Sequence, residues 1–151
     1  MKGAKRIYLD VCCVNRPFDD QGQERIHLET EAIETILLHM EQGEWRWVGS
    51  GALLFEATNV TDLERRDRVM QLLAGVKDWV PVRESERQRA ASLIALGFKP
   101  LDALHIACAE SAEVDVVLST DDRLLRMAAR RVSDLRVPVL NPLRWLEEQL
   151  T

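Results

Sequence analysis

The sequence predicts an α/β fold, in which a parallel sheet of about five strands is covered by helices on both faces as a three-layer sandwich. Short apolar segments with strand character alternate with longer segments of helical period along the chain. The connections between these segments are short, and no repeat or low-complexity tract interrupts them. A strand, helix, strand order with short connections favours parallel pairing and a sheet buried on both faces.

The size and composition of the chain agree with this fold. Its 151 residues predict one domain spanning residues 1–151. Hydrophobic residues make up 46% and charged residues 30%, as in ordinary globular proteins. Apolar runs fall short of the about 20 residues that a membrane span needs. The basic start at residues 1–6 precedes an apolar patch too short for a secretory leader, so we expect a cytoplasmic protein without a membrane partner.

Strands are predicted where apolar or alternating residues run over a few positions. In chain order these ranges are 6–9, 45–49, 79–82, 114–118 and 137–140. The third range contains Pro81, which favours an edge position because proline cannot donate a ladder hydrogen bond. The range 114–118 is rich in valine and has the strongest strand propensity.

Helices are predicted where apolar residues recur at helical spacing between those strands. Their ranges are 24–42, 51–57, 61–74, 85–96, 101–109, 122–131 and 142–150. Terminal signals support these boundaries: Ser50 and Asn141 are good N-caps, and Pro100 suits a first helical position. Gly43 suits a helix end, and Thr61 begins a Thr-x-x-Glu capping box.

Acidic residues occupy places where a carboxylate is costly to bury. Asp10 ends the first strand before a predicted turn at residues 15–17, Glu56 lies in an apolar helix, Asp102 begins another, and Asp121 follows the strongest strand. The ends of parallel strands meet at one edge of the sheet, so these acids are expected to converge. Lysine and arginine are missing from these apolar segments, and a divalent cation would relieve the repulsion between the carboxylates.

Each acid also has a structural explanation when it is taken alone. Asp121 and its neighbour Asp122 could cap a helix, and Asp102 suits the positive end of a helix dipole. Glu56 could be an exposed residue of an amphipathic helix. Asp10 is the hardest to explain in this way, because the sequence shows no helix for it to cap.

Four blocks of the chain, residues 8–10, 54–57, 101–107 and 118–124, resemble in order the motifs of the PIN domain. This nuclease fold occurs in bacterial toxins of the VapC type and in several RNA-processing enzymes. The resemblance covers nearly the whole chain. It implies that the family's acidic residues fall on Asp10, Glu56, Asp102 and Asp121, and its polar residue on Ser119.

The resemblance further implies a metal-dependent endoribonuclease that hydrolyses phosphodiester bonds of single-stranded RNA. Mg²⁺ or Mn²⁺ would be held by Asp10, Asp102 and Asp121, with Glu56 binding directly or through water. The family also suggests the toxin of a toxin–antitoxin pair, with an antitoxin protein as partner and a homodimer as assembly. His105 is expected to be a core imidazole that donates to a backbone carbonyl or a carboxylate rather than to bind metal.

Departures from the family pattern leave alternatives open. Val11 and Cys12 stand where the family commonly has Thr-Asn, and Asp122 competes with Asp121, which we prefer from the spacing to Leu124. A catalytically silent PIN-like assembly module is one alternative. A phosphate-accepting receiver-like domain is another, although it would need paired acids after the first strand and a lysine after the fifth. Arg16 is a candidate for contact with a substrate phosphate.

Overall fold

The protein forms a single five-stranded sheet in the order β3-β2-β1-β4-β5, and each neighbouring pair is parallel. The computed structural model describes residues 3–151, so the first two residues of the basic start lie outside the described residues. The strands are β1 (Lys5–Leu9), β2 (Trp45–Ser50), β3 (Asp78–Val80), β4 (Val116–Leu118) and β5 (Val139–Leu140). The predicted parallel sheet of about five strands is confirmed.

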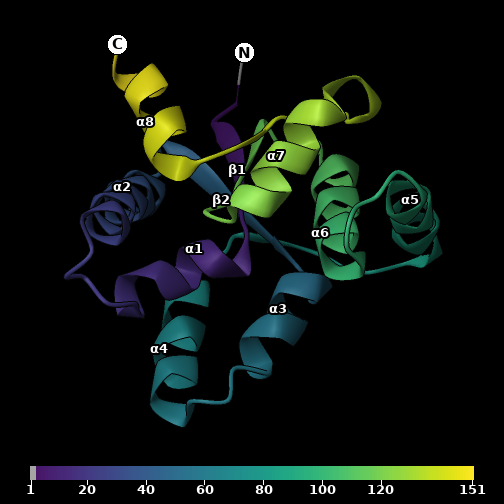
Figure 1. The fold of residues 1–151 in the computed structure, drawn as a ribbon. Coiled ribbons are helices and arrows are strands. Elements are labelled where there is room, and N and C mark those ends of the chain that lie inside the picture. Colours follow the sequence, from purple (N-terminus) through teal and green to yellow (C-terminus); the bar gives the residue numbers. More distant parts are fainter. Residues whose placement is uncertain (1–2) are drawn as a thin grey trace.

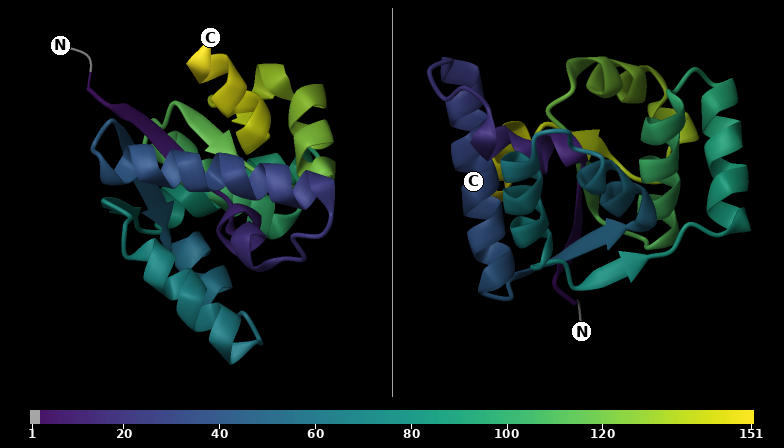
Figure 2. Two further views of the ribbon diagram at one scale, coloured as in Figure 1. Left: turned by 90° about the vertical axis from the view of Figure 1, so that its left-hand side faces the viewer. Right: turned by 90° about the horizontal axis from the view of Figure 1, so that it is seen from below.

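Helices cover both faces of this sheet (Figure 1). They are α1 (Val11–Asn15), α2 (Glu24–Glu41), α3 (Gly51–Thr58), α4 (Leu63–Leu73), α5 (Glu84–Ala95), α6 (Pro100–Ser111), α7 (Asp122–Arg130) and α8 (Pro142–Leu150), with 3-10 helices η1 (Arg16–Phe18) and η2 (Val132–Asp134). Figure 2 (right) shows α2 on one side of the strands and α5 and α6 on the other. The predicted three-layer arrangement is therefore confirmed.

The central strand β1 brings distant parts of the sequence together. Its residues Ile7, Tyr8 and Leu9 are fully buried, and Leu9 lies beside Leu118 of β4 in the parallel register. The backbone N–H of Asp10 donates to the carbonyl of Leu118 at 3.0 Å. As predicted, the carboxyl ends of β1 and β4 therefore meet at the same edge.

Asp10 caps the short helix α1, which the sequence did not predict, and the predicted turn at residues 15–17 falls on the end of α1 and on η1. Its side chain accepts a hydrogen bond from Val11 N at 2.7 Å. Helix α1 then ends at Asn15, and Pro17 lies in the 3-10 helix η1. The expectation that Asp10 caps nothing was wrong. A five-residue helix is too short to produce the apolar periodicity on which helix prediction relies.

Other helix and strand ends follow the sequence closely, with small corrections. Ser50 accepts from Leu53 N, Asn141 caps α8, and Gly43 adopts the left-handed φ of 81° after α2, as predicted. The cap of α4 is Asp62 rather than Thr61. β3 is an edge strand as expected, but it ends at Val80, before the proline that cannot donate to the ladder. Within residues 3–151, no helix combines the length and apolar character that crossing a bilayer requires.

Candidate metal centre

Asp10 is buried at the carboxyl edge of the sheet, where several donors fix both of its oxygens. It is only 5% exposed. Oδ1 accepts from Val11 N, while Oδ2 accepts from the Ser119 hydroxyl at 3.0 Å and lies 3.4 Å from the Cys12 thiol. These donors give a buried polar group the hydrogen-bond partners that its burial requires. They also leave lone pairs on both oxygens for another ligand.

Ser119 connects the first acid to the last. The Oγ atom that donates to Asp10 accepts a hydrogen bond from the backbone N–H of Asp121 at 3.1 Å. Ser119 is fully buried and directly follows β4. The sequence predicted a polar role for this residue at the strand end, and its position beside Asp10 agrees with that expectation.

Glu56 is turned towards the sheet edge by His105. Glu56 is half-buried on α3, and its Oε1 forms a hydrogen bond with His105 Nε2. On the other side of the imidazole, His105 Nδ1 lies 2.5 Å from the Tyr8 hydroxyl, which lies 2.6 Å from Ser50 Oγ. With a neutral imidazole, this chain runs in one direction: Ser50 donates to Tyr8, Tyr8 to Nδ1, and Nε2–H to the carboxylate.

Three side chains offer ligand atoms within 4.8 Å of one another: Asp10, Glu56 and His105. They come from the end of β1, from α3 and from α6. Burial alone would lower the pKa of His105, but the hydrogen bond to Glu56 and the charges of Asp10, Glu56 and Asp102 raise it. The acids around His105 therefore favour its charged form, and burial opposes it.

Asp102 lies in the first turn of α6, within the electrostatic reach of the other acids. Its pKa is raised to about 6, first by burial and then by the charges of Asp10 and Asp121, with a smaller contribution from Glu56. His105 opposes this shift. A carboxyl group whose pKa rises because of neighbouring carboxylates belongs to a crowded negative site, which a cation would relieve.

Asp121 and Asp122 have different environments. Asp121 caps α7 by accepting from Arg123 N at 2.9 Å, and its charge acts on Asp102. Asp122 forms a bidentate ion pair with Arg25 of α2, with both N···O distances at 2.7 Å, and this pairing lowers the pKa of Asp122. Asp122 is therefore engaged with another helix, whereas Asp121 is exposed and acts on Asp102 through its charge.

The four acids predicted from the sequence thus differ in how closely they gather. Asp10 and Glu56 belong to the tight cluster with His105. Asp102 and Asp121 lie outside this 4.8 Å group of the described residues. The charges of Asp10, Glu56 and Asp121 act on Asp102, and Asp121 is linked to Asp10 through Ser119. Cys12 contacts Asp10, Ser119 and the backbone N–H of Thr120.

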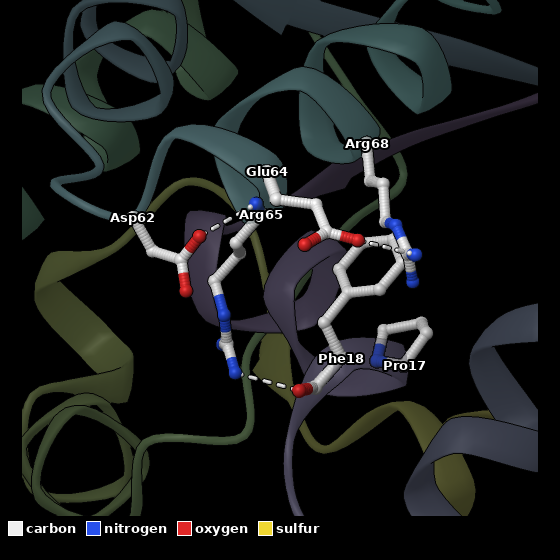
Figure 3. A pocket seen from close by; sticks show the side chains of 6 residues that line it. All are labelled: Pro17, Phe18, Asp62, Glu64, Arg65 and Arg68. Carbon is white, nitrogen blue, oxygen red and sulfur yellow. Dashed lines mark hydrogen bonds and ion pairs between the residues drawn. The ribbon is translucent and has the colours of Figure 1, made fainter.

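A hollow of about 360 Å³ lies away from these acids, between η1 and α4 (Figure 3). It is lined by Pro17, Phe18, Asp62, Glu64, Arg65 and Arg68. The Arg65 guanidinium donates to the Phe18 carbonyl at 2.6 Å and to Asp19 at 2.8 Å. Arg68 pairs with Glu64 on the same helix. Because its arginines already have acidic or carbonyl partners, this hollow is a weaker anion site than its composition suggests.

The cations that line a hollow with one of the acids are not the one expected from the sequence. Arg16, the candidate for phosphate contact, donates to Glu29 and Asp19 and is only 17% exposed. The Arg16 guanidinium therefore joins η1 to α2 within the fold. Lys99 and Arg123 instead line a small hollow together with Asp102.

Comparison with known proteins agrees with this architecture. The chain is similar to a crystal structure of VapBC2 from Rickettsia felis bound to a DNA fragment from their promoter, with a TM-score of 0.55 and 9% identity over 90% of this chain and 97% of that chain. At this identity the similarity shows the fold alone. None of the curated proteins compared with the chain matches it. A family model described as PIN domain matches residues 7–130, which include all four acids, and the chain therefore belongs to the PIN domain family.

Proposed function

We propose that this protein is a divalent-metal-dependent endoribonuclease that hydrolyses phosphodiester bonds of single-stranded RNA. The observation that carries the proposal is the cluster of Asp10, Glu56 and His105 at the carboxyl edge of the sheet in a PIN domain. PIN domains are generally nucleases. Ligands of open parallel sheets bind at this edge, where chain segments distant in sequence meet.

The donor set suits Mg²⁺ or Mn²⁺. Both ions favour carboxylate oxygens and water, which Asp10, Glu56, Asp102 and Asp121 can provide together. The raised pKa of Asp102 supports a cation in this place, because a positive charge would offset the burial and the neighbouring carboxylates that cause the shift. In this proposal Asp10 and Glu56 bind most directly, and Asp102 and Asp121 complete the site.

When bound, the ion supplies positive charge for the phosphodiester oxygens and lowers the pKa of water. The chain's own residues orient the carboxylates before the substrate arrives. Ser119 and Val11 N hold Asp10, and His105 holds Glu56. Such fixed orientation limits the reorganisation needed during the reaction. In this proposal Lys99 and Arg123, which line a hollow with Asp102, contact a substrate phosphate.

A role as the toxin of a toxin–antitoxin pair in the cytoplasm belongs to the same proposal. It is supported by the similarity in fold to the VapBC2 structure. Leu54 and Phe55 of α3 and Leu63 at the start of α4 are exposed, and they offer apolar surface for an antitoxin protein or a second copy in a homodimer.

The test is cleavage of a labelled single-stranded RNA by purified protein in Mg²⁺ or Mn²⁺. We expect cleavage that EDTA and the Asp10→Asn substitution abolish, and that Asp67→Asn leaves unchanged. Asp67 is an exposed acid on α4 and serves as the matched control. Equal cleavage by wild type and Asp10→Asn would show a contaminating nuclease and contradict the proposal. Mn²⁺ binding without cleavage of any single-stranded RNA would favour the silent assembly module.

A further inference from the structure

Arg25, in the first turn of α2, reaches across to the turn between β4 and α7. Its Nη1 and Nη2 atoms each lie 2.7 Å from one oxygen of Asp122. Nη2 also donates to the backbone carbonyl of Thr120 at 3.2 Å. The two residues held by this guanidinium are the immediate neighbours of Asp121. One side chain therefore fixes the chain on both sides of a proposed metal-binding acid.

Arg25 is itself held by a buried carboxylate. Its Nε donates to Glu29 Oε2 at 3.3 Å, and Glu29 is only 2% exposed. The same carboxylate accepts from Arg16 at 2.9 Å and from Asn141 at 2.6 Å. A buried acid with several partners is rigid, so the direction of the Arg25 fork is set by residues from η1, α2 and the start of α8.

The geometry of the contact between Arg25 and Asp122 suits a residue that positions the neighbouring backbone. An exposed ion pair usually contributes little to stability, because solvent screens it and side-chain entropy opposes it. Here the planar fork binds both oxygens of one carboxylate and a backbone carbonyl, which fixes direction as well as distance. Asp121 is joined from its other side by its backbone N–H to Ser119, so the turn is fastened at both ends.

We propose that Arg25 is a positioning residue, which holds the β4–α7 turn through Asp122 and Thr120 so that Asp121 completes the metal site. This inference rests on the proposed function. It also gives Asp122 a role: Asp122 acts through Arg25, and Asp121 acts on the metal.

The test measures Mn²⁺ affinity by titration calorimetry for wild type, Arg25→Gln, Asp122→Ala and the double variant. We expect each single variant to bind Mn²⁺ about tenfold more weakly, as is typical when a residue that orients a metal ligand is lost. The double variant should bind no more weakly than Arg25→Gln, because both single substitutions remove the Arg25–Asp122 contact and only Arg25→Gln also removes the contact with Thr120. Glu64→Gln and Arg68→Gln, which break an exposed ion pair within α4, should leave the affinity unchanged.

The sign of the Arg25→Gln effect separates positioning from simple electrostatics. Removing a positive charge near an acidic site would strengthen cation binding if charge alone mattered. Unchanged or tighter Mn²⁺ binding by Arg25→Gln would therefore overturn the inference while leaving the proposed function intact. A wild type that bound no Mn²⁺ would contradict the proposed function, and the inference would fall with it.

Steady-state kinetics give a second measurement, because the loss of a positioning arginine and the loss of a substrate-binding arginine change kcat and KM differently. Positioning predicts a lower kcat with a nearly unchanged KM for RNA in both Arg25→Gln and Asp122→Ala. If Arg25 instead bound a substrate phosphate, Arg25→Gln would raise KM and Asp122→Ala, which frees the guanidinium, would not. That second pattern would overturn the inference. Thermal melting of each variant confirms that it is folded before these comparisons are made.

Discussion

The hydroxyl of Ser119 donates a hydrogen bond to Oδ2 of Asp10 at 3.0 Å, across the boundary between β1 and β4. The two residues are far apart in sequence and meet because their strands are parallel neighbours. The same hydroxyl accepts from the backbone N–H of Asp121. Ser119 thus links the acid that follows β1 to the acid that follows β4.

The substitution Ser119→Ala should weaken the metal site by removing this link. Asp10 would lose a buried donor, and the N–H of Asp121 would lose its acceptor, which predicts about tenfold weaker Mn²⁺ binding. The free energy of unfolding should fall by about 1–2 kcal/mol. Calorimetric Mn²⁺ titration and urea unfolding measure both effects. Ser92→Ala, which removes an exposed hydroxyl bonded to its own helix, is the control and should change neither.

The substitution Asp102→Asn should stabilise the metal-free protein at neutral pH. The folded-state pKa of Asp102 is about 6, above its ordinary value, so the folded protein holds this proton more tightly than the unfolded chain does. Its contribution to the free energy of unfolding is therefore greatest at low pH and is lost as the pH rises through about 6. Asp102→Asn has no titrating carboxyl group at this position, so this loss does not occur. Its free energy of unfolding at pH 7 should therefore exceed that of wild type by about 1 kcal/mol, after allowance for solvent screening.

Urea unfolding in EDTA at pH 4 and pH 7 tests the Asp102 prediction. The difference between Asp102→Asn and wild type should be small at pH 4 and should grow towards pH 7. A difference independent of pH would show that the pKa of Asp102 is not raised in the folded protein. Saturating Mn²⁺ should reverse the order at pH 7, because it stabilises wild type by binding.

The substitution Tyr8→Phe should destabilise the fold although the ring is kept. Tyr8 is fully buried, and burial raises the pKa of its hydroxyl well above the ordinary value, so the group stays protonated. Its loss leaves Ser50 Oγ and His105 Nδ1 without this partner inside the core. We expect a decrease of about 1–3 kcal/mol in the free energy of unfolding. Thr35→Ala, which removes an exposed hydroxyl, should cost about 0.5 kcal/mol or less.

The substitution Arg89→Ala should cost far more stability than Arg87→Ala on the same helix. Arg89 donates to both oxygens of Glu110, whose side chain is 2% exposed and also accepts from Arg136 N. Removing Arg89 leaves a buried carboxylate without its cation, at a cost of about 3 kcal/mol. Arg87 pairs with Glu84 in solvent, so its loss should cost less than about 1 kcal/mol. Similar costs in urea unfolding would contradict the assigned difference in burial.

Much of the fold could be predicted because its signals are local. Short stretches of sequence indicate the alternation of strands and helices, the caps at Ser50 and Asn141, and the edge position of the strand before Pro81. The helix α1 was missed because five residues are too few to show a period. The choice of Asp62 over Thr61 as a cap depends on backbone geometry that both residue types allow.

The candidate site was harder to predict, because its contacts cross the sheet. The four acids could be proposed from their positions at strand and helix ends. The contacts of His105 with Glu56, of Cys12 with Ser119, and of Arg25 with Asp122 join residues 49, 107 and 97 positions apart, and a single sequence has no signal for them. The roles of the acids, and the assignment of residues 1–151 to one nuclease domain, stay predictions.

Calorimetric titration of Mn²⁺ into the purified, EDTA-treated protein at pH 7 measures whether acids from separate segments of the chain form one divalent-cation site, with Asp10→Asn and Asp67→Asn as the matched pair of variants. We expect saturable binding by wild type and Asp67→Asn, and at least about a tenfold loss of affinity in Asp10→Asn. Equal Mn²⁺ affinity in all three proteins, or no binding by wild type, would contradict a shared cation site.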